Sequence, residues 1–462
     1  MNFRPPGGPL SRPLSVRRWL TPGIGIKRWF VVVFLGMLVL ALGVAHVLRQ
    51  ATRDLEPGGA TQAVLDAVTF QFLPYQLRGL IAGVAGLALI GIGAVQMIRA
   101  FTDPFRRADS DQPLVEMIYQ KRFLSRGPRI VAIGGGTGLA TLLRGLKEHT
   151  SNLTAVVTVA DDGGSSGALR DELGIPPVGD IRNCIAALAD AEPLMSQLLQ
   201  YRFPGGRDGG PGNPVITEQG GLGGHAVGNL LIAALTAVEG GDFEEGVRQM
   251  NRVLAVRGQV LPVSPVPITL HAQLLDGSIV QGQSRIGLSR EIDRVWISPD
   301  DVAAAQDALT AIAEADAIVI GPGSLFTSLL PSLLVPGIRD ALAASGATRI
   351  YVCNVATQAG ETAGYDLARH VESLIAHTRR DVVDVVLANN QFGARAPVDW
   401  RAESVQLRWP PSGPSPMRLV LDDLVDPDNA RHHDPARLAG AVIRVIERES
   451  GARRRTGVAR SA

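Results

Sequence analysis

Hydrophobic residues gather into two long runs near the N-terminus. Residues 29–48 and 80–98 are almost entirely apolar, and His46 is the only ionisable residue in either run. At ~1.5 Å rise per residue, each run is long enough as a helix to cross the ~30 Å hydrocarbon core of a bilayer. The pattern therefore predicts a transmembrane hairpin over residues 29–98, with helices at about 29–48 and 80–98.

The charges that flank this hairpin predict its orientation. Residues 1–28 and the linker 99–127 are rich in Lys and Arg, whereas the loop 49–79 balances Arg against Asp and Glu. Cytoplasmic flanks of membrane helices carry an excess of basic residues. We therefore expect a two-pass protein of the cell membrane, with its basic N-terminus and its main domain in the cytoplasm. A signal peptide over the first run and a buried soluble helix over the second are the alternatives.

After residue 128 the pattern changes to short buried runs of β-branched residues, separated by helical patterns such as 139–149 and 365–378. Alternation of buried strands with crossover helices is typical of an α/β fold that is doubly wound around a mainly parallel sheet. We assign residues 128–448 to this domain. The candidate strands are 129–134, 153–160, 316–321, 349–354 and 383–389.

Two further segments belong to the same domain. Residues 256–298 interrupt the alternation and predict a hairpin with Asp276-Gly277 in a two-residue turn. A candidate strand at 417–424 is followed by a predicted helix over 435–449, for which Asp434 is the expected N-cap.

Composition and charge narrow the function. The 45 Lys and Arg residues nearly balance the 44 Asp and Glu residues, and aromatic residues make up only 5% of the chain. Without a basic surface or base-stacking aromatics, nucleic-acid binding is not expected. Cys184 and Cys353 lie far apart in apolar segments, so we expect buried free thiols rather than a disulfide. The basic tail 449–462 is expected to be disordered.

Glycine-rich loops follow the predicted strands and carry the candidate chemistry. The first loop, Gly134–Gly138, lies between a strand and a helix. Glycines let the backbone approach a ligand closely, and a helix start favours an anion. Asp161 follows the second strand, where a dinucleotide-binding fold places its ribose-binding acid. An NAD-dependent oxidoreductase is therefore one interpretation.

The segment after Asp161 indicates a second phosphate site. Asp161 and Asp162 stand beside backbone donors and the hydroxyls of Ser165 and Ser166, a combination that suits a cation together with a phosphate. Mg²⁺ is the expected metal on Asp161 and Asp162, and Arg170 is the expected bidentate partner of the same anion. The structural alternative is an acidic turn that only caps the following helix.

Polar residues also open a helix at Gly179–Asn183, and three further loops carry them: the third at 221–229, the fourth at Gly321–Ser328 and the fifth at 354–362. Asp180 is either an N-cap or a site residue, and His225 is either structural or an acid/base. Five such loops at the ends of parallel strands indicate one shared ligand site. Asp161, Asp162 and His225 are the catalytic candidates. The ligand-binding candidates are Gly134, Gly135, Gly136, Thr137, Gly138, Asp161, Asp162, Gly163, Gly164, Ser165, Ser166, Arg170, Asp180, Arg182, Asn183, His225, Asn229, Gly321, Gly323, Ser324, Thr327, Asn354 and Thr357.

These motifs resemble the CofD-like superfamily, and most of all its bacterial gluconeogenesis-factor branch, the YvcK-like proteins. The matching stretches include VAIGGGTGLATLLRGLK, TVADDGGSSGALRDELGIPPVGDIRNCIAALAD, IVIGPGSLFTSLLPSLLVPGI and YVCNVATQAGETAGY, all within residues 129–390. The membrane hairpin lies outside the shared region.

The resemblance implies a Rossmann-like domain that binds UDP-sugars such as UDP-N-acetylglucosamine. It also implies a role in linking carbon supply to the synthesis of cell-wall peptidoglycan and to the regulation of cell shape. Carried over by motif, the loops Gly134–Gly138 and Gly321–Ser324 would face the phosphates, and Asp161 and Asp162 would lie by a metal or the ribose.

Three functions follow from these patterns. The leading one is a gluconeogenesis factor that binds a nucleotide sugar and acts at the inner membrane through regulatory or cell-wall-synthesis proteins. The second is a metal-dependent transferase of the 2-phospho-L-lactate transferase type, with Asp161 and Asp162 holding Mg²⁺ and His225 as acid or base. The third is the oxidoreductase, which the missing G-x-G-x-x-G spacing disfavours. Whether any reaction is catalysed and whether the chain forms a homo-oligomer stay open.

Overall fold

The computed structural model describes residues 123–189, 193–204, 221–391, 403–411 and 417–455, and the isolated positions 34, 37, 41, 74 and 91. The predicted hairpin and most of the predicted linker lie outside these described residues. The chain divides into units 1–120 and 121–462, and the second unit is the one considered below. Among the described helices, none is by itself both long and apolar enough for a membrane span; the bent pair 325–333 and 336–344 meets that test only when taken together.

A seven-stranded sheet forms the centre of the second unit, and each pair of neighbouring strands in it is parallel. The spatial order is β10-β9-β8-β7-β1-β2-β3, so the chain order reverses at β1. The predicted α/β fold with a mainly parallel, doubly wound sheet is confirmed. The strands are β1 Ile130–Gly134, β2 Leu153–Val157, β3 Gln259–Pro262, β7 Ala317–Ile320, β8 Thr348–Val352, β9 Val385–Asn389 and β10 Arg418–Asp422.

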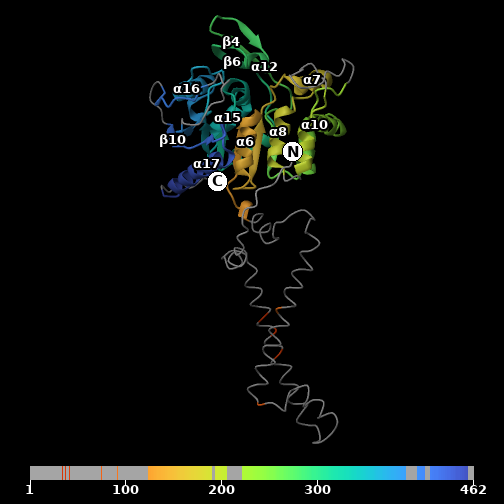
Figure 1. Cartoon of the computed structure of the whole chain (residues 1–462), viewed down its shortest axis with the longest axis vertical. Coiled ribbons are helices and arrows are strands. Elements are labelled where there is room, and N and C mark those ends of the chain that lie inside the picture. Colours follow the sequence, from red (N-terminus) through yellow and green to blue (C-terminus); the bar gives the residue numbers. More distant parts are fainter. Residues whose placement is uncertain are drawn as a thin grey trace, which may run out of the picture. The chain divides into compact units, whose positions relative to one another are not determined.

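Helices pack around this sheet because right-handed crossovers between parallel strands place them on its faces. Figure 1 shows α6 between α17 and α8, and it packs against both; α13 and α15 form another packed pair. The helices are α6 Gly136–Leu146, α7 Gly164–Leu173, α8 Gly179–Leu188, α9 Pro193–Gln200, α10 Val227–Val238, α11 Phe243–Val253, α12 Gln283–Ile286, α13 Gln306–Glu314, η2 Leu325–Leu329, α14 Leu330–Leu333, α15 Pro336–Ala344, α16 Leu367–His377, η3 Arg380–Val382 and α17 Pro435–Arg455.

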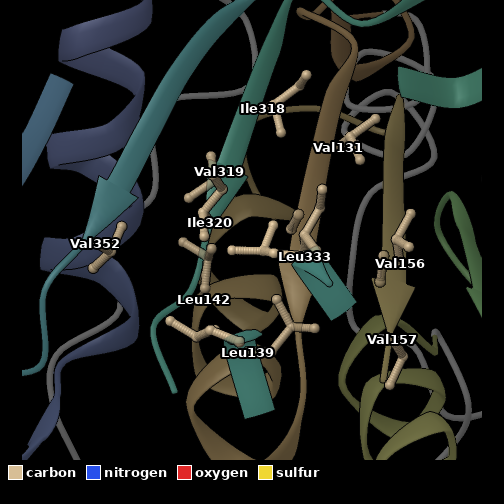
Figure 2. Packing of buried hydrophobic residues seen from close by; sticks show 14 of the residues in the cluster. Val131, Leu139, Leu142, Val156, Val157, Ile318, Val319, Ile320, Leu333 and Val352 are labelled. Carbon is tan, nitrogen blue, oxygen red and sulfur yellow. The ribbon is translucent and has the colours of Figure 1, made fainter. Parts of the chain in front are cut away.

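The central strands are buried on both faces. All residues of β1, β2 and β9 are buried, which is why these runs read as continuously apolar rather than alternating. Figure 2 shows Leu139 and Leu142 of α6 in the same cluster as Ile320 of β7 and Leu333 of α14. This core holds the strand ends, and therefore the loops that follow them, at defined positions.

The insertion between β3 and α13 forms a separate three-stranded antiparallel sheet of order β5-β4-β6, with β4 Thr269–Leu274, β5 Ile279–Gln281 and β6 Ile292–Ser298. The predicted hairpin is therefore confirmed. Its turn holds three residues instead of the predicted two, because the amide of Leu274 donates to the carbonyl of Ser278. A second small hairpin is formed by β11 Val425–Asp426 and β12 Asn429–His433.

The C-terminal helix is longer than predicted. The predicted cap is confirmed, since the amide of Arg437 donates to Asp434 Oδ1 at 2.8 Å. The helix then continues to Arg455, because the Arg-rich start of the expected disordered tail is made of good helix formers. The expected free thiols are also confirmed: Cys184 and Cys353 are buried and unpaired with each other.

Candidate functional site

The first and fourth glycine loops lie at the point where the strand order reverses. β1 pairs with β2 on one side and with β7 on the other, and ligands of doubly wound sheets bind outside the carboxyl ends of strands at such a switch point. The loop after β1 is Gly134–Gly138, and the loop after β7 is Gly321–Ser328. The sheet topology therefore brings together two loops that are almost 190 residues apart in sequence.

These two loops touch each other closely. A Cβ atom on Gly138 would lie 2.7 Å from the carbonyl oxygen of Pro322 and 3.1 Å from the amide nitrogen of Gly323. Gly136 has φ +66°, a backbone conformation that favours glycine. Any larger residue at 138 would separate the loops, so the glycines serve close backbone approach. Thr137 is exposed at the first turn of α6.

Helices that begin at this edge lack side-chain caps. The N-cap positions of α6, α7, α8 and α10 make no side-chain hydrogen bond to the helix. By contrast, α11, α16 and α17 are capped by Asp242, Asp366 and Asp434. The amides of Gly136 and Gly163 at two of these starts donate to Asp180 and Asp161. The remaining first-turn amides can meet an anion, and the helix dipole favours negative charge there. The carboxyl edge is therefore suited to phosphate.

Asp161 and Asp180 form an acidic pair beside these helix starts. Asp161 Oδ1 accepts a hydrogen bond from the amide of Gly163 at 3.0 Å, and its Oδ2 lies 3.4 Å from a Cβ position on Gly179. Burial raises the pKa of Asp161. Burial, together with the charge of Asp161, raises the pKa of Asp180 to about 6. Asp180 is not the N-cap of α8, because that position is Val178; instead it accepts from the amide of Gly136.

Asp162 and Arg170 are engaged with the antiparallel insertion. Asp162 Oδ1 accepts from the amide of Ser284 in the first turn of α12 at 2.8 Å. The guanidinium of Arg170 donates to the carbonyl of Ile268 at 2.9 Å and to Thr269 Oγ1 at 2.8 Å. Both side chains therefore tie the second loop to the insertion, and the roles expected for them on a metal and an anion stay predictions.

Asp161 and Asp180 lie near enough for their charges to interact. In the described part of the chain, no group of three or more His, Cys, Asp or Glu side chains is arranged to hold a metal ion. Mg²⁺ is commonly held by one or two carboxylates together with substrate phosphates. Asp162 Oδ1 is bonded to α12, whereas Asp161 and Asp180 interact with each other through their charges. The assignment of Mg²⁺ to Asp161 and Asp162 stays a prediction.

The fifth loop, which follows β8, is hydrogen-bonded to the fourth loop, which follows β7. Asn354 Nδ2 donates to the carbonyl of Gly323 at 2.9 Å, and Gln358 Nε2 donates to Ser324 Oγ at 2.7 Å. Glu361 accepts from the amide of Phe326 and from the hydroxyl of Thr327. Glu361 is only 5% exposed, and burial raises its pKa. The hydroxyls of Ser324 and Thr327, predicted to face the ligand, are therefore used in this loop contact.

Two other predicted ligand-binding residues, Thr357 and Asn183, form hydrogen bonds with neighbouring residues. Thr357 exchanges hydrogen bonds with the backbone of Glu403, through its amide at 2.7 Å and its hydroxyl at 2.9 Å. Asn183 Oδ1 accepts from Arg182 at 2.9 Å and from Gln200 of α9 at 3.5 Å. Both side chains stabilise the surroundings of the site in this arrangement.

Ser165, His225 and Asn229 form a buried polar cluster next to Arg182. Ser165 Oγ lies 3.1 Å from His225 Nδ1 and accepts from Asn229 Nδ2 at 2.9 Å. These three residues and Arg182 are each at most 7% exposed. The structure thus brings together predicted site residues from the starts of three helices, α7, α8 and α10.

Unpaired buried polar atoms concentrate at this edge. Seven buried side-chain atoms in the described ranges have no hydrogen-bond partner, and five of them are Thr158 Oγ1, Arg182 Nε, Asn229 Oδ1, Gln283 Oε1 and Gln358 Oε1. Buried polar atoms in native proteins are nearly always paired with protein, bound water or a ligand, so these atoms are available to a ligand or to water.

Sequence reasoning missed four of the residues that shape this edge: Thr158, Gln283, Gln358 and Glu361. Thr158 directly follows β2, and Gln358 and Glu361 lie within the fifth loop. These three could have been found from the sequence, because each is a polar residue that follows a buried strand. Gln283 lies in the insertion, and no pattern in the sequence connects that segment with the site.

A cavity of about 350 Å³ lies at the opposite edge of the sheet, among the amino ends of β1, β2 and β3. Its polar lining includes Arg129, Asn152, Gln259 and Glu314. Arg129 is paired with Glu314 at 3.5 Å, and no glycine-loop residue lines this cavity. The donors suited to phosphate are at the carboxyl edge, so we place the candidate site there.

Asp162→Ala should lower the free energy of unfolding by about 0.5–2 kcal/mol, the usual cost of losing a helix cap. The reason is that Asp162 holds the first turn of α12 through the amide of Ser284. Asp162→Asn keeps an acceptor oxygen and serves as the matched control, with near-wild-type stability expected. Urea denaturation of the full-length chain measures both, and equal stability of the Ala variant and wild type would contradict the capping role.

Asp180→Asn should reduce the pH dependence of stability. The folded-state pKa of Asp180 is about 6, above its ordinary value of 3.8, so the native state binds the proton more tightly and loses stability as pH rises through this window. The free energy of unfolding of the Asn variant relative to wild type should therefore increase by on the order of 1–3 kcal/mol between pH 4 and pH 7. Urea midpoints at several pH values measure this, and a constant difference would show that the pKa is not raised.

Comparisons with known proteins agree with this architecture. The model of the family "2-phospho-L-lactate transferase CofD" matches residues 130–407, more than half of the chain. The gluconeogenesis factor of Bacillus subtilis is 47% identical over 337 residues, covering 70% of this chain and 100% of its own length. A relative from Deinococcus radiodurans is 37% identical over 455 residues, covering 94% of this chain and 91% of its own.

A solved structure shows the same fold. The crystal structure of a UPF0052 family member from Bacillus halodurans is 41% identical in sequence, covers 69% of this chain and 99% of that chain, and superposes with a TM-score of 0.60. The sequence and structural matches agree with each other. The chain therefore belongs to the 2-phospho-L-lactate transferase CofD family and is a homologue of the gluconeogenesis factors.

Proposed function

We propose that this chain is a gluconeogenesis factor that binds a nucleotide sugar of the UDP-N-acetylglucosamine type at the carboxyl edge of its sheet. The observation that carries the proposal is the concentration of unpaired buried polar atoms at that edge, from Thr158 on the β2 side to Gln358 on the β8 side. Such a spread suits a ligand with several polar parts, and the starts of α6 and α7, whose N-cap residues are glycines, suit its diphosphate.

In this proposal ligand binding links carbon metabolism to cell-wall synthesis and cell shape. The gluconeogenesis-factor name of the Bacillus subtilis relative supports the metabolic side. The output would pass to regulatory or cell-wall-synthesis proteins that recognise the liganded domain, and a second copy of the chain is a further candidate partner.

A transferase of the 2-phospho-L-lactate type is the second candidate. The pair Asp161 and Asp180 favours it, because two carboxylates with raised pKa values beside a phosphate site are suited to Mg²⁺. These two residues would hold the ion, and the ion would supply charge stabilisation to a diphosphate-linked donor. His225, hydrogen-bonded to Ser165, is the available acid or base.

We also propose that the chain is anchored in the cell membrane by the hairpin 29–98, with the main domain in the cytoplasm. Two apolar runs flanked by basic residues support this. The match with the Deinococcus radiodurans relative covers 94% of the chain, so it extends into the N-terminal region that precedes the α/β domain.

Ligand titration of the full-length chain tests the binding proposal. We expect saturable binding of UDP-N-acetylglucosamine without turnover, and weaker or no binding of GDP and NAD. Metal-dependent release of UMP or GMP would favour the transferase instead. Binding of NAD alone would overturn both, because neither uses that cofactor.

Alkaline carbonate extraction of cell membranes tests the anchor. We expect the full-length chain to stay in the membrane pellet, since integral helices resist extraction, and a variant lacking residues 29–98 to appear in the supernatant. Release of the full-length chain would contradict the anchor and would leave the ligand proposal untouched.

A further inference from the structure

Three helix starts place complementary hydrogen-bonding groups side by side. Ser165 lies in the first turn of α7, Arg182 in that of α8 and Asn229 in that of α10. The stem of Arg182 packs on α10, since a Cβ atom on Gly228 would lie 2.8 Å from Arg182 Cδ. Arg182 and Asn229 are therefore near neighbours, although 46 residues separate Arg182 from Gly228 in the chain.

Hydrogen-bond accounting leaves an acceptor and a donor unused. Asn229 donates through Nδ2 to Ser165 Oγ, and the one hydrogen of Ser165 then has His225 Nδ1 as its partner at 3.1 Å. Asn229 Oδ1 has no partner although Asn229 is only 1% exposed. Arg182 donates to Asn183 through a terminal nitrogen, while its Nε is buried and unpaired. Each such atom is costly unless a ligand satisfies it.

An unpaired acceptor on Asn229 beside an unpaired donor on Arg182 disfavours charged ligand groups. A phosphate has oxygen acceptors and no donors at neutral pH, so it cannot satisfy Asn229 Oδ1, whereas the amide donors of the glycine loops suit it. A cationic group such as an ammonium has donors and no acceptors, so it cannot satisfy Arg182 Nε. A sugar carries hydroxyls that both donate and accept, so it offers a donor for Asn229 Oδ1 and an acceptor for Arg182 Nε.

We propose that Arg182 and Asn229 form a subsite for a neutral, hydroxyl-bearing sugar, held in place by Ser165 and His225. The proposal rests on the proposed function, because it assigns the sugar half of the nucleotide sugar to this cluster. The nucleotide and its diphosphate then contact the glycine loops and the uncapped helix starts. Recognition of the sugar and recognition of the nucleotide are thus carried by different residues.

Paired titrations of the full-length chain with UDP and with UDP-N-acetylglucosamine test this assignment. Asn229→Ala and Arg182→Lys should each weaken binding of the nucleotide sugar by roughly tenfold, and weaken binding of UDP much less. Arg182→Lys keeps the positive charge and loses the Nε donor, so it separates the hydrogen bond from the charge. Thr236→Val is the matched control on α10, since the Thr236 hydroxyl bonds only within that helix, to the carbonyl of Ile232.

The outcomes separate this proposal from the one on which it rests. If wild type binds neither ligand, the proposed function fails and the subsite fails with it. Suppose that wild type binds the nucleotide sugar, and that both variants either weaken binding of the nucleotide sugar and of UDP equally or leave both affinities unchanged. The nucleotide-binding proposal then stands, and the subsite is overturned. Thermal unfolding of each variant shows whether it is folded. The change in ligand affinity is taken from the variants that are folded.

Discussion

The site depends on one constraint, the parallel direction of all seven strands with the chain order reversing at β1. Parallel strands present their carboxyl ends at a single edge, so loops far apart in sequence must meet there. The strand ladder passes directly into the loops: the amide of Thr158 donates to the carbonyl of Gly134, and the amide of Gly321 donates to the carbonyl of Ile133, both at 2.9 Å. The rigid sheet therefore sets the spacing of the backbone donors that would surround a diphosphate.

Around this edge, many polar side chains hold loops rather than face a ligand. Asn354, Gln358 and Glu361 fasten the fourth loop, while Asp162 and Arg170 fasten the insertion. These contacts order the loops before a ligand arrives, and pre-ordered loops reduce the entropy lost on binding. The groups left for a ligand are backbone amides, the acidic pair, and the few side chains whose atoms have no partner.

The sequence predicted the strands and the loops well, because buried β-branched runs and glycine clusters are local signals. It did not predict which neighbouring segments the polar side chains bond to. Asp162 and Ser324 were expected to face a ligand, but their partners, Ser284 and Gln358, are contributed by distant segments. Asp180 was an attractive N-cap by position, yet its carboxylate accepts from Gly136 on a neighbouring helix. Such choices are made by tertiary packing, which local propensity does not contain.

The chain enters the second unit at the end of the sheet opposite to the candidate site. The chain enters the domain at the amino ends, where the amide of Ser151 donates to the carbonyl of Leu124 and the hydroxyl of Thr150 donates to the carbonyl of Pro128, both at 3.0 Å. The candidate site lies at the carboxyl ends, about 17 Å away along a five-residue strand at ~3.3 Å per residue. The entry segment around Leu124 is therefore not part of the candidate site, and the loops at the carboxyl edge are held by the sheet rather than by this segment.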